Sequence, residues 1–337
     1  MSCRRWNPLV VLGWLAGFWT ASSGIAEGWG DRLSYTVFAE GDLSRLERGD
    51  VLGKRATLER GPNVMAVQTC YVVPVPIERT AAALLQWDPS RNPELGVRIH
   101  RPVRSPARLE DFADLVLSAK IAPDRVAYQR ASELAEGSLV QFVSRSELNW
   151  FKQHRNNPAE AWKQILFGRV KSYQTSGLKE MPPYEGVRPP FKVQSGWQNV
   201  VSQTPEVTRR FIDLLQTSLN NPQGRQENTA QKFYWEMLDV QGETTFLLGV
   251  VHQRPGDGSV QTADLQFYVS AHFSSALLLH EMWPITWNGR PATLVWRGDY
   301  VLLPAAMTGQ GIERMASENL LLQEVRRAVA AFVKSCQ

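Results

Sequence analysis

The chain has 337 residues, a formal net charge of +4 and three cysteines. Its length fits two domains or one decorated domain. A charge this close to neutral disfavours a nucleic-acid-binding protein, because such proteins carry a marked excess of Lys and Arg.

The first 26 residues have the parts of a cleavable signal peptide. Arg4 and Arg5 form the charged part, the run from Leu9 to Trp19 is uncharged and mostly apolar, and small residues follow up to Ala26. A membrane anchor is the alternative, but this run of about eleven residues is short against the roughly 20 that span a bilayer. We therefore predict cleavage after Ala26 and export to the periplasm or beyond, with no further membrane span.

Cleavage would change the charge and the cysteine content of the mature protein. Arg4 and Arg5 would be lost without any acidic residue, so the formal charge would fall from +4 to +2, and Cys3 would be lost as well. Cys70 and Cys336 would remain, and two cysteines in an oxidising compartment are candidates for a disulfide. Two separate thiols are the alternative.

The rest of the sequence changes in character twice, which divides it into residues 27–104, 105–222 and 223–337. In the first region, Gly61 and the residues beside it separate two strand-like runs, 50–60 and 64–75, as in a hairpin. Pro76 then suits the start of a helix that we expect over residues 77–87.

The middle region is helical and irregular. Apolar residues recur at steps of three and four over residues 109–117, 159–173 and 205–219. Four prolines interrupt residues 177–196, which predicts an extended surface connection. We interpret the region as a helical insertion or a small helical domain.

The last region predicts a series of antiparallel strands followed by one long helix. The strand patterns cover residues 244–253, 260–272, 275–287 and 292–303. After Gly311, apolar residues recur along one face of a helix to about Val333, and such a face packs on a sheet. The predicted fold class is therefore α+β, an antiparallel sheet gripping a long C-terminal helix, with a helical insertion.

Asn288 and Gly289 form a two-residue hairpin turn, which fixes a register between the last two strands. The predicted pairs are His280 with Arg297, Glu281 with Trp296, and Leu278 with Asp299. An Arg297–Asp299 pair buried in a cavity would be a functional site, and a solvent-facing ion pair is the alternative. Trp296 is a further ligand-binding candidate, although large aromatic side chains also fill protein cores.

A polar cluster lies at the end of the second of these strands. Strand alternation places Tyr268, Ser270 and His272 on one face, where they would line a ligand cavity or form a solvated surface. In a cavity, His272 and Tyr268 would also be candidates for an acid–base pair. The sequence contains no G-x-S-x-G, H-E-x-x-H, P-loop or G-x-G-x-x-G motif, and no metal site or cofactor is predicted.

The order of these elements resembles the helix-grip arrangement of the START-like, or SRPBCC, lipid-binding superfamily. The run V-V-P-V-P-I from Val72 to Ile77, continued to Trp87, is similar to the first strand and helix of that superfamily. The resemblance covers residues 50–87 and 244–332 and leaves the helical middle outside. It implies a cavity between the sheet and the last helix that takes a lipid or another hydrophobic small molecule, and it implies no fixed catalytic residue.

The chain also resembles uncharacterised exported bacterial proteins of similar layout. The stretches that carry this likeness are residues 177–184, 233–235 and 267–272. It implies no activity.

Three functions therefore stay open. The first is an exported binding or carrier protein for a hydrophobic small molecule or lipid. The second is an extracytoplasmic enzyme that uses His272 and Tyr268, and the third is a non-enzymatic envelope interaction protein. A cavity between the last helix and the sheet would favour the first, and a filled core would favour the third.

Overall fold

The computed structural model describes residues 32–56, 58, 63–138, 142–186, 189–220, 228–303 and 312–337. The predicted signal peptide and its cleavage site lie outside these residues. Within them, no helix has both the length and the apolar character needed to cross a membrane.

In this described part of the chain, eight strands form one antiparallel sheet. The strands are β1 (Leu52–Arg55), β2 (Val64–Val73), β3 (Val97–Val103), β4 (Ala230–Val240), β5 (Glu243–Pro255), β6 (Val260–Val269), β7 (Ser275–Trp287) and β8 (Arg290–Leu302). Their spatial order is β1-β2-β8-β7-β6-β5-β4-β3. The consecutive strands β4 to β8 thus form a meander, which β2 and β3 extend at its two ends.

Helices precede, interrupt and follow this sheet. They are α2 (Leu43–Glu47), α3 (Ile77–Leu85), α4 (Ala122–Ala135), α5 (Leu148–Gln153), α6 (Pro158–Ser176), α7 (Val193–Gln203), α8 (Pro205–Arg210), α9 (Ile212–Asn220) and α10 (Ile312–Cys336). Short 3-10 helices are η1 (Glu40–Asp42), η2 (Pro89–Arg91), η3 (Pro93–Leu95), η4 (Leu109–Phe112), η5 (Arg145–Glu147) and η6 (Gly177–Glu180). The helices α4 to α9 all fall between β3 and β4, where the sequence predicted a helical middle.

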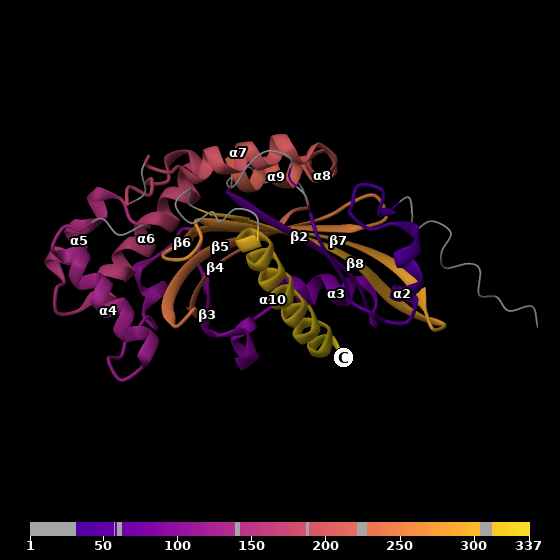
Figure 1. Cartoon of the computed structure of the whole chain (residues 1–337), viewed down its shortest axis with the longest axis horizontal. Helices are drawn as coiled ribbons and strands as arrows, with labels where there is room; N and C mark the ends of the chain where they lie inside the picture. The colour runs from indigo at the N-terminus through magenta and orange to yellow at the C-terminus, as the bar shows by residue number, and fades with distance from the viewer. Residues whose placement is uncertain are drawn as a thin grey trace, which may run out of the picture.

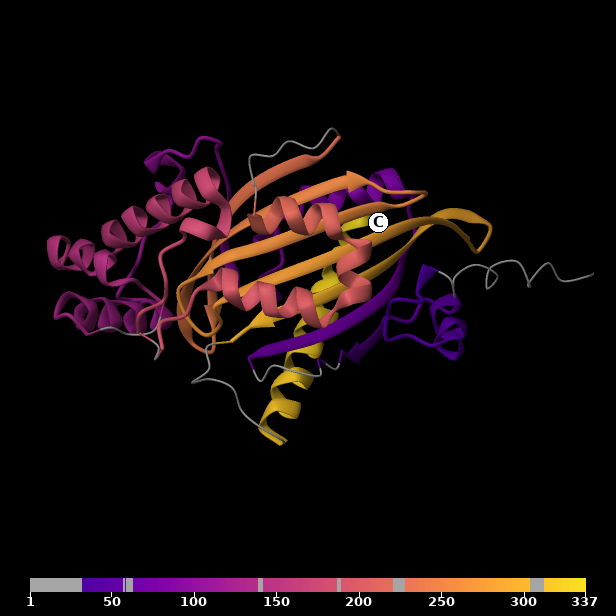
Figure 2. The same ribbon diagram turned by 90° about the horizontal axis from the view of Figure 1, so that it is seen from above.

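The sheet has a helical layer on each side. Figure 1 shows it arching over α3 and α10, with α7, α8 and α9 on its opposite side, and Figure 2 shows α4 to α6 beyond one end of the sheet. We call the side packed on α10 the grip face, which carries Tyr71 and Val295. The other side is the insertion face, which carries Trp235 and Trp296.

The antiparallel sheet and the long C-terminal helix confirm the predicted α+β class and are compatible with a helix-grip fold. The predicted register is also confirmed, since β7 and β8 pair Trp287 with Arg290 and His280 with Arg297. Both turn residues between them have positive φ, 51° at Asn288 and 72° at Gly289. This backbone twist matches that of the two flanking strands.

The helical middle differs in detail from the predicted pattern. A helix over residues 109–117 is wrong, because only the single turn of η4 forms there. The Asp111 carboxylate accepts hydrogen bonds from the backbone N–H groups of Arg104 and Arg108, and such local bonds favour a turn over a continued helix. The predicted helix over 205–219 is divided into α8 and α9 at Phe211, whose ring is fully buried in the core.

Of the two states that the sequence left open for Cys70 and Cys336, the structure has the two separate thiols and not the disulfide. In the part of the chain that the structure describes, both cysteines are free thiols. Cys70 points from β2 into the core of the insertion face, whereas Cys336 packs with the grip-face cluster at the end of α10. The sheet itself separates the two sulfur atoms.

Candidate functional site

A cavity of about 770 Å³ lies between the grip face and α10. Its apolar lining includes Leu84 and Leu85 of α3 and Leu321, Val325 and Phe332 of α10. Small-molecule sites in proteins have volumes of roughly 300–1,000 Å³ and mostly apolar walls with a few polar groups. The helix and the sheet therefore border a partly open space of ligand size, which we call the grip-face cavity.

Polar side chains from three adjacent strands form the floor of this cavity. The strand register places Thr262 of β6, His280 of β7 and Arg297 of β8 in one row. Asp264 and Asp299 lie two residues away from that row on β6 and β8. All five side chains line the cavity.

Arg297 and Asp299 form an ion pair inside the cavity. The guanidinium Nε lies 2.8 and 3.1 Å from the two Asp299 oxygens, and Nη2 lies 2.6 Å from Oδ1. Burial opposes the charge on Arg297, but the Asp299 carboxylate outweighs it and raises the pKa of the guanidinium. Of the two locations that the sequence left open for this pair, the structure has the buried one.

His280 faces the cavity with its hydrogen-bonding capacity unused. The residue is 3 % exposed, and neither ring nitrogen has a hydrogen-bond partner among the described residues. Burial, and then the charge of Arg297, hold the pKa of His280 well below its ordinary value. The ring is therefore neutral at neutral pH, with one nitrogen as a donor and the other as an acceptor.

Asp264 is held by a tyrosine that reaches across a neighbouring strand. The hydroxyl of Tyr234, on β4, donates to Asp264 Oδ1 at 2.8 Å. The Tyr234 ring crosses β5 at Gly249, where a Cβ would overlap the ring, so this position needs a glycine. Burial raises the pKa of Asp264 to about 7, and the negative charge of the nearby Glu236 adds to this rise. The hydrogen bond from Tyr234 lowers the pKa but does not cancel the effect of burial.

Tyr268 lies on the opposite side of the sheet from this cavity. Tyr268 pairs with Leu248 while Gln266 pairs with Gly249, so Phe267 is an extra residue in a β-bulge. Both the Phe267 and the Tyr268 rings consequently pack in the insertion-face core. The expectation that Tyr268 and His272 share a face is wrong, because β6 ends at Val269 and the strand alternation does not continue to His272, whose φ is 69°.

Two other predicted ligand-binding residues also lie away from the cavity. Ser270 uses its hydroxyl to accept a hydrogen bond from the Phe246 backbone N–H at 2.8 Å. Trp296 packs in the insertion-face core, where its Nε1 donates to Gln68 Oε1 at 3.0 Å. The Tyr268 ring, in turn, lies 4.2 Å from the Arg169 guanidinium. These contacts place all three side chains within the packing of the insertion face.

Of the residues that the sequence placed at a site, His272, Arg297 and the Asp299 paired with it line the cavity. His272 lies beyond the end of β6 with a φ of 69°, and its Nε2 is 3.3 Å from Glu243 Oε2. Since Tyr268 lies on the other face, the structure does not assemble the predicted His272–Tyr268 acid–base pair. No cluster of three or more His, Cys, Asp or Glu side chains suited to a metal ion occurs in the described residues.

Sequence reasoning missed Asp264 and Tyr234. Period-two alternation from Thr262 to Gln266, with Ala263 and Leu265 between the polar residues, is a signal that could have identified Asp264. Tyr234 could not be found in this way, because its role depends on the lateral order of β4, β5 and β6.

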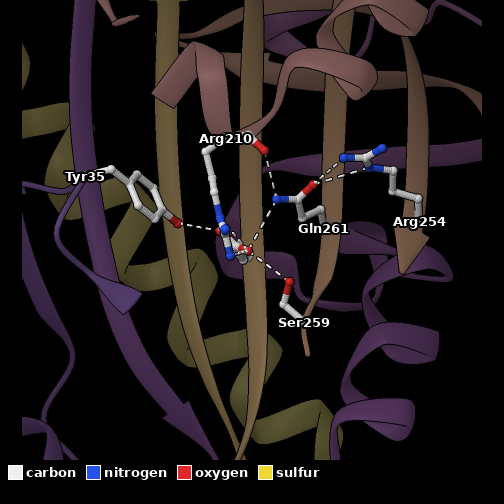
Figure 3. Close-up of polar contacts among 6 residues, drawn as sticks. Tyr35, Arg210, Arg254, Ser259 and Gln261 are labelled. Atoms are coloured by element: carbon white, nitrogen blue, oxygen red, sulfur yellow. Dashed lines mark hydrogen bonds and ion pairs between the residues drawn. The ribbon is translucent and has the colours of Figure 1, made fainter. Parts of the chain in front are cut away.

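A second polar cluster lies on the insertion face around the fully buried carboxylate of Glu281. Figure 3 shows Tyr35, Arg210, Ser259 and Gln261 gathered around this group. Tyr35 donates at 2.8 Å, Ser259 at 2.9 Å and Gln261 at 3.3 Å. Arg210 adds three contacts of 2.5 to 3.0 Å. The cluster joins the N-terminal segment and α8 to the sheet, and its hydrogen bonds are internal, so it has the character of a structural anchor.

Comparison of the chain with protein-family models, with curated proteins and with solved structures finds no match.

Proposed function

We propose that the protein binds or carries a hydrophobic small molecule or lipid in the grip-face cavity. The observation that carries this proposal is the cavity of about 770 Å³ between the sheet and α10. Burial of a ligand's apolar surface would drive binding, at about 0.8 kcal/mol for each buried CH₂ group. The polar row across the floor would orient the ligand.

We also propose that the chain is a START-like helix-grip protein with a large insertion. The support is topological: β2 is followed by α3, β8 returns to pair with β2, and α10 then crosses the grip face. This is the element order on which the sequence resemblance depends. The helices α4 to α9 would be the addition to that plan, and α7 to α9 lie on the face opposite the cavity (Figure 2).

Export belongs to the same proposal and has its own test. We expect the protein isolated from the envelope of its source cell to begin at Glu27, because cleavage is predicted after Ala26. N-terminal sequencing of that protein checks the prediction. A protein that stays in the cytoplasm and begins at Met1 would contradict it.

The binding proposal is tested by filling the cavity. Ala328 lines the cavity from α10, whereas Ala330 is exposed on the same helix. Native mass spectrometry of freshly purified protein should show co-purified or added lipid on the wild type and on Ala330→Trp, and little on Ala328→Trp. Absence of any lipid on the wild type after incubation with a lipid panel would overturn the proposal, as would equal loading of the two variants.

A further inference from the structure

We infer that the grip-face cavity selects an uncharged amphiphile, whose hydroxyl or carbonyl head group hydrogen-bonds to His280 while its apolar part lies against α3 and α10. This inference rests on the proposed binding function and adds the chemical class of the ligand. The occupant would be an alcohol, ester or amide with an apolar chain, in preference to a carboxylate or an amine.

Among the described residues, nothing uses the hydrogen-bonding capacity of the His280 ring. A buried polar group without a partner loses its hydrogen bonds to water without replacement, so native structures seldom keep one without a reason. His280 is 3 % exposed and lines the cavity, and within the described part of the protein both of its ring nitrogens lack a partner. A ligand hydroxyl or carbonyl in the cavity would supply a hydrogen-bond partner for one of these ring nitrogens.

The floor of the cavity disfavours an anionic head group. Arg297, the cation beside His280, already directs Nε and Nη2 to Asp299. Glu236 and Asp264 face the same space, and Glu324 lines it from α10. A carboxylate on the ligand would therefore meet a neutralised guanidinium and several acidic groups.

The same floor also disfavours a cationic head group beside His280. Arg297 lies directly opposite His280 in the strand register, and the Asp299 carboxylate that could attract an ammonium there is already paired with the Arg297 guanidinium. Lys232 adds a second positive charge on the β4 side, where it lies in the field of Asp264, Glu236 and Asp88. His100 is hydrogen-bonded to Glu236 at 2.8 Å. The charged groups of the floor are thus largely paired with opposite charges of the protein itself. An uncharged head group leaves these pairs intact.

The test uses four probes with one chain length: 1-decanol, decanoate, decylammonium and decane. Dissociation constants are measured at pH 8 from the tryptophan fluorescence, because Trp87 lines the cavity. We expect 1-decanol to bind about tenfold more tightly than either charged probe. His280→Leu should weaken 1-decanol binding about tenfold and change decane binding less than about twofold. His280→Gln keeps a donor and an acceptor and should retain most of the preference for the alcohol.

The matched control is Tyr268→Phe, which removes a buried hydroxyl on the insertion face and should leave all four constants unchanged. Decanoate or decylammonium binding as tightly as 1-decanol would overturn the inference while leaving the binding function standing. Equal weakening of 1-decanol and decane by His280→Leu would do the same. Failure of all four probes to bind the wild type would instead overturn the binding function, and the inference with it.

Discussion

Two neighbouring polar residues on β7 have opposite environments on the two faces of the sheet. On the insertion face, the buried carboxylate of Glu281 accepts hydrogen bonds from Tyr35, Arg210, Ser259 and Gln261 (Figure 3). On the grip face, His280 directs its ring into the cavity. The residues are adjacent on β7, so strand alternation alone assigns one to each face.

This difference separates the interactions that build the fold from those available to a ligand. The contacts of Glu281 span the N-terminal segment, α8, β6 and β7, and together they hold distant parts of the chain in place. The polar groups of the grip face have fewer partners, and within the described residues the Asp264 side chain accepts one hydrogen bond, from Tyr234 of β4. Substitutions on the two faces should therefore have different, and in part opposite, effects on stability.

The largest effect is expected on the insertion face. Glu281→Ala leaves its donors without their acceptor and should lower the free energy of unfolding by about 3 kcal/mol, measured by chemical denaturation. Arg210 is partly exposed, so its guanidinium can turn to water, which limits the loss. The control is Glu206→Ala, whose side chain is 58 % exposed in its pair with Arg209 and should change the value by less than about 0.5 kcal/mol. A loss below about 1 kcal/mol for Glu281→Ala would refute the role of anchor.

On the grip face, Asp264→Asn should stabilise the protein at alkaline pH. The pKa of Asp264 is about 7 in the folded protein, against 3.8 for an ordinary aspartate. The folded state therefore binds an extra proton between these values, and stability is lost as the pH rises from about 4 to about 7.

The asparagine removes this loss while it still accepts the hydrogen bond from Tyr234. Because Asp264 lines the cavity, where water weakens the penalty, we expect a gain of about 2 kcal/mol at pH 8 that shrinks towards zero near pH 4. Denaturation curves of both proteins across this range measure it. A gain that is constant with pH would show that Asp264 ionises normally in the folded protein.

A smaller change, opposite in sign to that of Glu281→Ala, is expected for His280→Leu. It replaces a buried polar ring with an apolar side chain and should raise the free energy of unfolding by about 1 kcal/mol at pH 7. The folded pKa of His280 is well below 6.5, so the unfolded histidine takes up a proton first and wild-type stability is lost as the pH falls below 6.5. The advantage of the variant should therefore grow towards pH 5. A loss of stability at both pH values would mean that the His280 side chain stabilises the fold, as the Glu281 side chain is expected to do.

Much of the fold could be predicted because its signals are local. Asn288 and Gly289 specify a turn with positive φ at both residues, and this turn alone fixed the pairing of His280 with Arg297. Hydrophobic periodicity likewise identified α6 and α10. The helix expected over 109–117 failed because the side chain of Asp111 competes for backbone N–H groups, an effect that periodicity does not contain.

The candidate site was less predictable, because it depends on which face each strand residue occupies. Arg297 was found through the hairpin register, whereas Tyr268 was assigned to the wrong environment because β6 ends at Val269, before the alternation from Tyr268 can reach His272. Tyr234 reaches Asp264 only across Gly249, which requires knowledge of three neighbouring strands. Contacts of this kind arise from the lateral order of the sheet, which the linear sequence does not display.

For the two thiols, one on each face of the sheet, we expect no change in stability when a reducing agent is added. Cys70 lies in the insertion-face core and Cys336 in the grip-face cluster, so the intervening sheet prevents a bond between them. Dithiothreitol should therefore leave the free energy of unfolding unchanged, within about 0.5 kcal/mol, whereas reduction of a native disulfide commonly costs about 2–5 kcal/mol. Thiol titration in denaturant should give the same number of reactive groups before and after reduction. A lower number before reduction, together with a stability loss on reduction, would show that the chain joins its two faces covalently and would require a different path for the end of α10.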